Sequence, residues 1–338
     1  MTRMMNAIRQ HQFGGPQVLT YEQAPLPELN PGEVRIRVHA IGINPPDWYL
    51  REGFKDLPPE WQPTVKFPLI LGSDVSGVIE AIAEDVEGFT IGDEVYAMVR
   101  FPEGMLGDSS GYAEYVTAPA LEVALKPARI DHLQAAAAPM SLLTAWQFLI
   151  EQGHTAANPF QSQPHQPVPL KGKRVLINGA AGGVGHYAVQ LAKWQGAHVI
   201  AVASSRHQNL LHELGADEVV DYTQTNVGER FSDLDLVMDT VGGQHAERFL
   251  QTLKPAGALF LAYPLGFDAY AKAEARNITV SATQVRSHGG QLQTLAGLFN
   301  DGTIKTVIDS VYPLVEAAAA HERAASGHLQ GKIVLRVD

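Results

Sequence analysis

The sequence predicts an α/β fold in which a doubly wound parallel sheet is inserted into a discontinuous β-rich domain. Three patterns along the 338 residues predict it: short alternating runs fill the first third, strand and helix patterns alternate from Lys173 to Tyr263, and a mixed pattern follows from Asn277. Apolar strands joined by amphipathic crossover helices form parallel sheets, so the middle third is the doubly wound part. The expected domain limits are 1–130, 131–275 and 276–338, with the last segment returning to the first domain.

The first third consists of short strands separated by turns rich in Gly, Pro and Asp. Between Val34 and Ala40, apolar side chains alternate with two arginines and a histidine, which predicts a strand with one buried face. Similar runs lie at 72–82, 93–99 and 111–117, with turn signals between them. We therefore expect a compact β-rich domain in this part of the chain.

Helical patterns begin near Asp131, whose side chain can cap a helix that continues to Ala138. A second helix is expected from Ser141 to Gln152, because apolar side chains recur there at helical spacing. The expected strands of the parallel sheet are 174–178, 198–203, 218–221, 234–239 and 258–262. The expected helices between them are 184–195, 206–214 and 244–253. The returning segment adds a strand after 277, a helix near 291–300, a strand near 307, a helix near 314–325 and a strand at 332–337.

Composition excludes several classes of function. The formal net charge is 25 − 36 = −11 and no run of Lys and Arg exceeds two, so neither nucleic acid nor an anionic membrane is an expected partner. The absence of cysteine excludes disulfides, thiolate nucleophiles and Cys-ligated zinc. No signal peptide and no apolar stretch of about 18 residues is recognisable, so a cytoplasmic location is expected. Residues 154–170 are expected to form a surface loop, in which nothing fixes His154 and His165 as metal ligands.

The strongest local signal is a glycine-rich turn between a strand and a helix. The apolar run from Arg174 to Asn178 leads into Gly179-Ala-Ala-Gly-Gly-Val-Gly185, and an amphipathic helix follows at βαβ length. Glycines allow a backbone to approach a pyrophosphate closely, and a helix N-terminus attracts anions. The residues expected to contact the pyrophosphate are Ala181, Gly182, Gly183 and Val184. The alternative is a glycine-rich turn that binds no ligand.

The end of the next strand indicates which dinucleotide is bound. An acidic side chain at this place would hold the ribose 2′-hydroxyl of NAD, but the sequence has Ser204, Ser205 and Arg206. Because a guanidinium binds phosphate through two hydrogen bonds, these residues favour the 2′-phosphate of NADP. The alternative is that Arg206 is a solvated residue in the first turn of a helix.

Further motifs follow one another along nearly the whole chain. They are Gly42 to Gly53, Gly72 to Gly77, Gly92 to Tyr96, Gly111 to Val116, Leu214 to Tyr222, Asp239 to Gly243 and Gly331 to Val334. With the glycine-rich turn, this series resembles the medium-chain dehydrogenase/reductase family. Within that family, it is similar to the zinc-independent quinone oxidoreductase-like branch, which includes the reticulon-interacting oxidoreductases. The resemblance implies a GroES-like substrate domain, a Rossmann cofactor domain, an active site in the cleft between them and a homodimer built through the cofactor domain.

The resemblance also argues against zinc and assigns candidate active-site residues. Zinc alcohol dehydrogenases of the wider family have Cys where this chain has Asn44 and His where it has Ser73, and amide and serine groups make no stable zinc site. We therefore expect no metal, and expect NADPH to reduce a quinone or the β-carbon of an enone. The resemblance places Asn44 at the nicotinamide ribose and the substrate, and makes Tyr49 a hydrogen-bond donor or proton source. Asp47 and Arg51 are expected to support this segment.

The resemblance places other residues along the cofactor. Thr144 is expected near the nicotinamide and Tyr222 near the adenine ribose phosphate, although Tyr222 has the alternative of a packed strand-end tyrosine. The residues expected along the nicotinamide half are Val241, Tyr263, Pro264 and Leu265. Structural roles are expected for His186 on a helix surface, for Asp74 in a hydrogen-bonded position, and for Trp48, Trp61 and Phe67 in the β-rich core.

Two other functions stay open on the sequence. One is a non-enzymatic NADPH-binding protein that acts as a redox-responsive partner or a nucleotide reservoir. It predicts an intact phosphate turn without a suitable polar donor, and Asn44 and Tyr49 argue against it. The other is an alcohol dehydrogenase with an atypical metal site, which predicts stoichiometric zinc.

Overall fold

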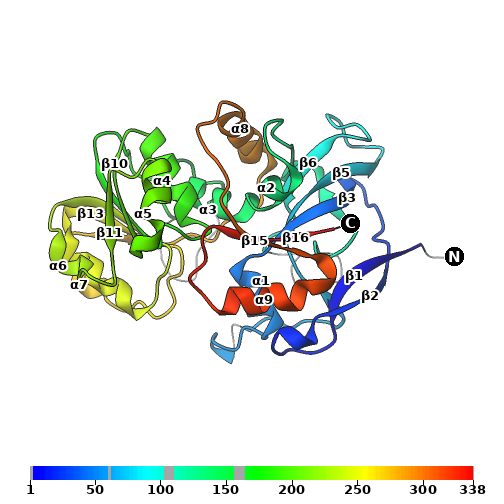
Figure 1. Ribbon diagram of the computed structural model, residues 1–338, viewed down its shortest axis with the longest axis horizontal. Helices are drawn as coiled ribbons and strands as arrows, with labels where there is room; N and C mark the ends of the chain where they lie inside the picture. The colour runs from blue at the N-terminus through cyan, green and yellow to red at the C-terminus, as the bar shows by residue number, and fades with distance from the viewer. Residues whose placement is uncertain (1–2, 60–61, 103–109, 156–163, 338) are drawn as a thin grey trace. The chain divides into compact units, whose positions relative to one another are not determined.

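A computed structural model describes residues 3–59, 62–102, 110–155 and 164–337. The chain forms two compact units (Figure 1). The first comprises residues 1–143, 286–302 and 306–338, and the second comprises 144–285 and 303–305. The predicted fold class is confirmed, because a parallel sheet is inserted into a β-rich part that is discontinuous along the chain. A compact unit is not yet an independently folding domain, so the limits 1–130, 131–275 and 276–338 stay a prediction.

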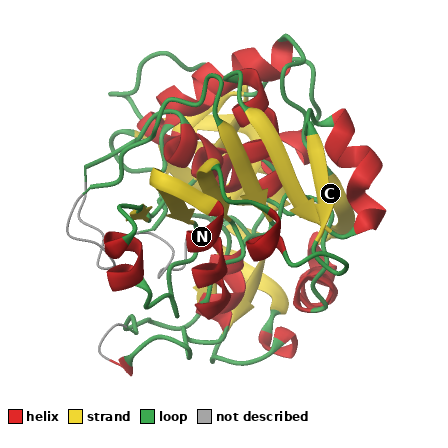
Figure 2. Ribbon diagram, turned by 90° about the vertical axis from the view of Figure 1, so that its left-hand side faces the viewer, coloured by secondary structure: helices red, strands yellow, loops and turns green. Residues whose placement is uncertain are grey.

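The first unit contains two sheets, whose strands are yellow in Figure 2. The larger has the order β15-β16-β3-β5-β6-β8, and β7 also pairs with β3. Its strands are β3 (Glu33–Gly42), β5 (Asp74–Ile82), β6 (Glu94–Met98), β7 (Tyr115–Pro119), β8 (Val123–Leu125), β15 (Ile308–Pro313) and β16 (Lys332–Arg336). The smaller has the order β2-β1-β4 and consists of β1 (Met4–Gln10), β2 (Thr20–Pro25) and β4 (Leu69–Ile70).

Three helices of the first unit lie close to the ranges expected near 131–138, 291–300 and 314–325, whereas the helix at 45–51 was not expected. The helices of this unit are α1 (Pro45–Arg51), α2 (His132–Ala136), α8 (Gly289–Asn300), α9 (Ala317–Ala325) and the 3₁₀ turns η1 (Pro16–Val18), η4 (Ala120–Glu122) and η7 (Leu314–Glu316), while α3 (Pro139–Leu149) begins here. Asp131 accepts a hydrogen bond from the Gln134 N–H at 2.8 Å, which confirms it as the cap of α2. Trp48 packs on the core of this unit, but Phe67 is 38% exposed, and Trp61 lies outside the described residues.

The second unit is built on a six-stranded parallel sheet with the order β11-β10-β9-β12-β13-β14. Its strands are β9 (Arg174–Asn178), β10 (His198–Ala203), β11 (Glu218–Asp221), β12 (Leu234–Asp239), β13 (Leu253–Leu261) and β14 (Thr279–Ser281). Its helices are α4 (Gly185–Trp194), α5 (Gln208–Glu213), α6 (Val227–Arg230) and α7 (Tyr270–Ala275), with the 3₁₀ segments η5 (Ser205–His207) and η6 (Gln244–Thr252). Figure 1 shows α4 to α7 gathered around these strands. Strands β9 to β12 have the predicted bounds.

Some elements of the second unit differ from the expectations. The segment 244–252 is a 3₁₀ helix, and β14, expected in the returning part, pairs with β13 in this sheet. The surface-loop prediction is wrong at His165, whose ring is buried. Its two nitrogens lie 2.7 Å from the Ser281 hydroxyl and 2.9 Å from the Phe148 carbonyl oxygen. The imidazole therefore partners two groups of the interior.

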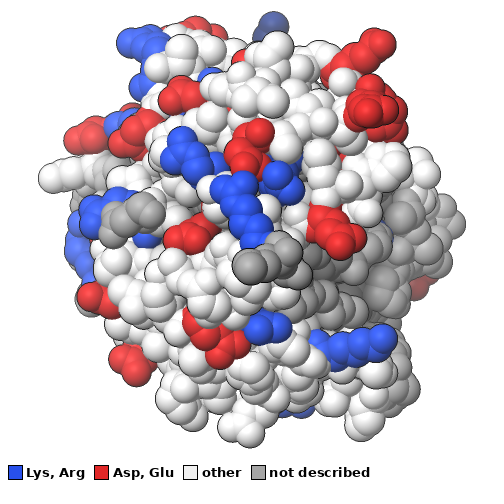
Figure 3. Space-filling model, turned by 90° about the vertical axis from the view of Figure 1, so that its right-hand side faces the viewer, with Lys and Arg blue, Asp and Glu red and all other residues white. Residues whose placement is uncertain are grey.

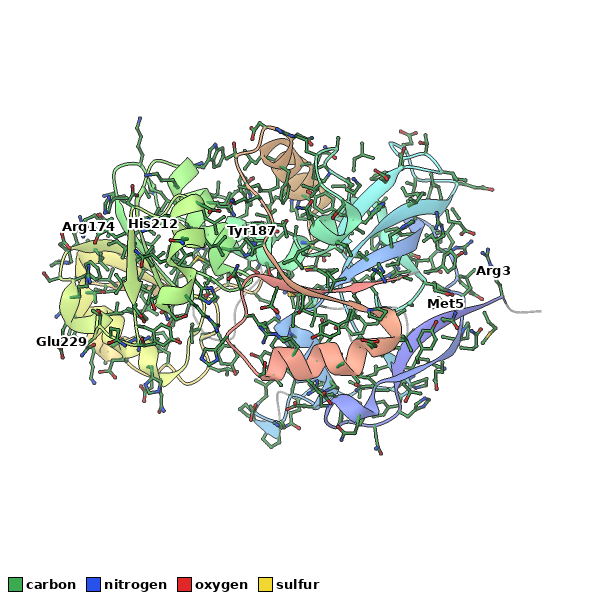
Figure 4. The ribbon with its side chains drawn as sticks, in the orientation of Figure 1. Arg3, Met5, Arg174, Tyr187, His212 and Glu229 are labelled. Atoms are coloured by element: carbon green, nitrogen blue, oxygen red, sulfur yellow. The ribbon has the colours of Figure 1, made fainter. Side chains whose placement is uncertain are left out.

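Charges are mixed on the surface. On the face that Figure 3 shows, Lys and Arg side chains lie between Asp and Glu side chains. In the second unit, Arg174 opens β9 (Figure 4). Its guanidinium donates to Asp233 at 2.9 Å. Within the described ranges, no helix has the length and apolar character needed to cross a membrane.

Candidate active site and cofactor site

The glycine-rich turn joins the end of β9 to the start of α4. Gly179 has a φ of +73°, which glycine adopts without strain. A Cβ at Gly185 would lie 2.2 Å from the Gly179 carbonyl oxygen and 2.7 Å from the Ala180 Cα, so only glycine fits. Helix α4 is thus packed directly on the turn, and its N-terminus, where the helix dipole attracts anions, begins at the turn. Of the N–H groups at this start, those of His186 and Tyr187 donate to the Gly182 and Val184 carbonyl oxygens at 3.1 and 3.2 Å. Gly182, Gly183 and Val184 are half-buried beside these groups, whereas Ala181 is buried. The turn fits a diphosphate.

His186 follows this turn, and the prediction that it lies on the helix surface is wrong. Its side chain is fully buried, as is that of Tyr187 beside it on α4 (Figure 4). The His186 Nδ1 lies 2.9 Å from the Gly182 carbonyl oxygen, which also accepts the His186 backbone N–H at 3.1 Å. Because a carbonyl only accepts, Nδ1 carries a hydrogen. The imidazole therefore braces the turn.

The ends of β9 and β12 carry a buried polar pair that the sequence analysis did not single out. The Asn178 Nδ2 donates to Asp239 Oδ1 at 2.8 Å, and the same oxygen accepts the N–H groups of Val241 and Gly242 at 3.0 and 3.1 Å. These bonds hold the backbone at Val241, and 60% of the Val241 surface is exposed. Of the other residues expected at the nicotinamide half, Tyr263, Pro264 and Leu265 are half-buried after β13, and Thr144 is buried in α3.

The ends of β10 and β11 lie side by side, because Ala203 and Asp221 are paired in register. Ser204 is half-buried, whereas Ser205 and Arg206 are exposed, and the Arg206 Nε donates to His207 Nε2 at 2.9 Å. Tyr222 is 46% exposed, so it is not a packed core tyrosine. The Asp221 carboxylate accepts hydrogen bonds from the N–H and the hydroxyl of Thr223. The sequence analysis placed Tyr222 near the adenine ribose phosphate but missed the carboxylate of Asp221, which precedes it.

In the first unit, Asn44 lies where β3 turns into α1. Its backbone N–H donates to Asp47 Oδ2 at 2.8 Å, in the capping box of α1. Its Nδ2 donates to Asp74 Oδ2 at 2.9 Å, and its Oδ1 accepts from the Lys332 ammonium, which also donates to the Ile43 carbonyl oxygen at 2.8 Å. Asn44 and Asp74 are fully buried, and Lys332 is 4% exposed. The carboxamide of Asn44 is therefore fixed from both sides by charged groups.

A chain of buried hydrogen bonds continues from Asp47. Its Oδ2 accepts from the Tyr112 hydroxyl at 3.1 Å, the Tyr112 oxygen lies 2.9 Å from His321 Nε2, and His321 Nδ1 lies 2.7 Å from Arg51 Nη1. A guanidinium can only donate, so Nδ1 accepts and Nε2 carries the hydrogen that it donates to Tyr112. Each hydrogen bond is therefore donated in the direction of Asp47, from Arg51 to His321, from His321 to Tyr112 and from Tyr112 to Asp47. Because the far end is an arginine, which does not release its proton, the chain orients Asp47 and carries no proton to it.

Burial controls the ionisation of this network. It raises the pKa of Asp47 to about 7 and that of Asp74 to about 6, although hydrogen bonds and the Lys332 charge oppose the change. Burial, assisted by the Arg51 charge, lowers the pKa of His321 to about 3, which agrees with the neutral imidazole required above. Burial also lowers the pKa of Lys332, against the attraction of the two carboxylates. These groups are coupled, so each charge depends on the others.

The raised pKa of Asp47 gives a pH-dependent stability. Since the folded carboxyl keeps its proton up to about pH 7 and the unfolded one only to about pH 3.8, the folded state binds more protons between these values. The contribution of Asp47 to stability is thus present below this window and lost as pH rises through it. We expect the free energy of unfolding of the wild type, minus that of Asp47→Asn, to fall by up to about 1.4 kcal/mol per pH unit there. Urea unfolding of both proteins from pH 4.5 to 8 measures this difference.

Contributions of Asp74 and His321 to this comparison cancel to first order, because both proteins contain them. A difference that stays constant across the pH range would contradict the raised pKa.

Tyr49, the expected proton source, is half-buried on α1. Its ring centroid lies 5.9 Å from that of Trp48 and 6.4 Å from that of Phe54. The residues that the sequence analysis missed in this unit are Tyr112, His321 and Lys332. Across the described part of the chain, no group of three or more His, Asp or Glu side chains is arranged to hold a metal ion.

Comparison with known proteins shows which family the chain is similar to. Residues 30–128 match the model of the alcohol dehydrogenase GroES-like domain, and residues 214–335 match that of a zinc-binding dehydrogenase. The mitochondrial NAD(P)H oxidoreductase RTN4IP1 of Mus musculus is 34% identical, over 96% of this chain and 87% of its own length. The chloroplastic quinone oxidoreductase QR1 of Triphysaria versicolor is 32% identical over 98% of both. The solved quinone oxidoreductase of Coxiella burnetii is 30% identical, with a TM-score of 0.83 over 99% of this chain and 100% of its own.

These similarities extend over almost the entire length of the chain, as the order of motifs predicted. The chain belongs to the medium-chain dehydrogenase/reductase family, in its quinone oxidoreductase-like branch. It is an oxidoreductase that uses a nicotinamide cofactor.

Proposed function

We propose that this protein is an NADPH-dependent, zinc-independent reductase of quinones and α,β-unsaturated carbonyl compounds. The observation that carries the proposal is the turn at Gly179 to Gly185, where only glycine permits the contact between α4 and the end of β9. A cradle of this kind places backbone N–H groups and a helix N-terminus at a diphosphate. The relatives named quinone oxidoreductases support the substrate class.

In the proposed reaction, each residue has a defined task. The turn residues Ala181 to Val184 would bind the diphosphate, and the cofactor would supply a hydride to an electron-poor carbon. Tyr49 would donate a hydrogen bond and then a proton to the carbonyl oxygen, so that one hydride and one proton complete the two-electron reduction. Asn44 would help to position the nicotinamide ribose and the substrate, because its carboxamide is itself held in place by hydrogen bonds with Asp74 and Lys332. No step requires a metal.

The test is a set of NADPH oxidation assays with simple quinones and enones. We expect a rate that depends on both NADPH and acceptor, that Tyr49→Phe lowers in kcat, and that zinc chelation leaves unchanged. Elemental analysis should find no stoichiometric zinc. Tight NADPH binding without turnover across a broad acceptor panel would contradict the proposal and favour a non-enzymatic NADPH-binding protein.

Arg206 should determine the preference for NADPH. We expect Arg206→Ala to weaken NADPH binding by about 1–3 kcal/mol, the usual size of a lost charge-assisted contact, and to leave NADH binding nearly unchanged. Titration of both dinucleotides against the same variant measures the two affinities. Equal losses for NADPH and NADH would refute the 2′-phosphate contact. Arg230→Ala, also an exposed arginine of the second unit, is the matched control.

We further propose a homodimer and a cytoplasmic location. Strand β14 is at the edge of the six-stranded sheet in the order given above, and an edge strand can pair with a second copy. Light scattering that finds only monomers would rule out the homodimer. Two of the relatives named here are mitochondrial or chloroplastic, RTN4IP1 and QR1, so fractionation of the source cells is the test of location.

A further inference from the structure

A carboxylate lies beside the residues proposed to bind the 2′-phosphate. Asp221 ends β11, and its register partner Ala203 ends β10, immediately before Ser204 and Ser205. Because neighbouring parallel strands end at one edge of the sheet, Asp221 lies at the same edge as the residues that follow β10.

Two hydrogen bonds fix the Asp221 carboxylate. The Thr223 N–H and hydroxyl donate to its Oδ1 at 2.8 and 2.7 Å. These bonds stabilise the ionised form and lower the pKa of Asp221, so the carboxylate is charged at neutral pH.

The Asp221 carboxylate favours one ligand over the other. A carboxylate only accepts hydrogen bonds, so it repels a 2′-phosphate, whereas a ribose 2′-hydroxyl can donate a hydrogen bond to it. The exposed Arg206 remains the cation suited to a 2′-phosphate.

We infer that Asp221 is a specificity-determining residue whose negative charge limits the preference for NADPH and lets the same site accept NADH. This inference rests on the proposed function, because it takes the adenine ribose to lie at the ends of β10 and β11. A 2′-phosphate there is attracted by Arg206 and repelled by Asp221, while a 2′-hydroxyl can donate a hydrogen bond to Asp221.

The test compares the wild type with Asp221→Asn. Asparagine keeps an oxygen that can accept the two Thr223 bonds but removes the charge. We expect the ratio of the Kd for NADH to the Kd for NADPH to rise about three- to tenfold, mainly through tighter NADPH binding, the size expected for a partly screened charge. Calorimetric titrations at low ionic strength measure both constants. Adenosine 2′-phosphate, which lacks the nicotinamide half, should show the same gain.

Asp217→Asn is the matched control. Asp217 precedes the other end of β11, is hydrogen-bonded to Lys193 at 2.6 Å and to the Val199 N–H at 2.8 Å, and gives the same change in net charge. It should leave the ratio unchanged. If Asp221→Asn does not fold, Asp221→Ser repeats the test with a shorter polar side chain.

The results for Arg206→Ala, Asp221→Asn and the wild type separate a failure of the inference about Asp221 from a failure of the proposed function. If Arg206→Ala lowers the NADH-to-NADPH ratio of Kd values but Asp221→Asn leaves it unchanged or lowers it, the inference about Asp221 is overturned and the NADPH site stands. If the wild type binds neither dinucleotide, the proposed function fails and the inference fails with it.

Discussion

Replacing Lys332 by methionine should lower the free energy of unfolding by about 3–5 kcal/mol. The ammonium is 4% exposed and donates to Asn44 Oδ1 and to the Ile43 carbonyl oxygen. Methionine has a similar length but no charge, so the carboxyl groups of Asp74 and Asp47 would lose the cation that favours their ionised forms. Both would have to take up protons or remain as uncompensated charges in the interior. Urea unfolding followed by circular dichroism at pH 7.5 measures the loss.

Two further variants make this prediction specific. Lys305→Met removes a lysine whose partner Glu213 lies 3.5 Å away, with side-chain exposures of 52% and 65%, so it should change stability by less than about 1 kcal/mol. Adding Asp74→Asn to Lys332→Met should restore part of the stability, because the double variant removes one uncompensated carboxylate and keeps an acceptor for the Asn44 amide. A Lys332→Met protein as stable as the wild type would show that the buried cation is dispensable.

The parallel sheet could be predicted from the sequence because its signals are local. Each of the strands β9 to β12 is a short segment with at least two consecutive apolar residues, so its bounds can be recognised without tertiary information. The glycine-rich turn is local too, and Gly185 has the close contact that the pattern predicted. An error arose where burial depends on neighbours far away in sequence, as at His165, whose ring contacts Ser281 and Phe260.

The buried network of the first unit could not be predicted in the same way. It joins the segment 44–51 to Asp74, Tyr112, His321 and Lys332, which are separated by up to 288 positions. No periodicity or spacing connects such residues, because only the sheet and helix packing bring them together. Asp221 was missed for a related reason, since its place beside Ser205 depends on the pairing of β10 with β11.

Gly185→Ala should both destabilise the protein and abolish dinucleotide binding. The added Cβ would lie 2.2, 2.7 and 2.8 Å from backbone atoms of Gly179 and Ala180, which cannot move as a flexible side chain can. Helix α4 would have to shift away from β9, at a cost of about 2 kcal/mol or more. The N-terminus of α4 would then be displaced from the proposed diphosphate site. We expect at least a tenfold weaker NADPH affinity, measured by titration, and a lower midpoint of urea unfolding.

Gly182→Ala separates these two effects. Its added Cβ would meet only the Gly179 carbonyl oxygen within 4 Å, at 3.3 Å, so we expect a change in stability of less than about 1 kcal/mol. The methyl group would nevertheless project where the backbone is proposed to approach the diphosphate, and NADPH binding should weaken about tenfold. A Gly182→Ala protein that binds NADPH as tightly as the wild type would place the diphosphate away from this residue. Normal stability of Gly185→Ala would likewise contradict the close packing of α4 on the turn.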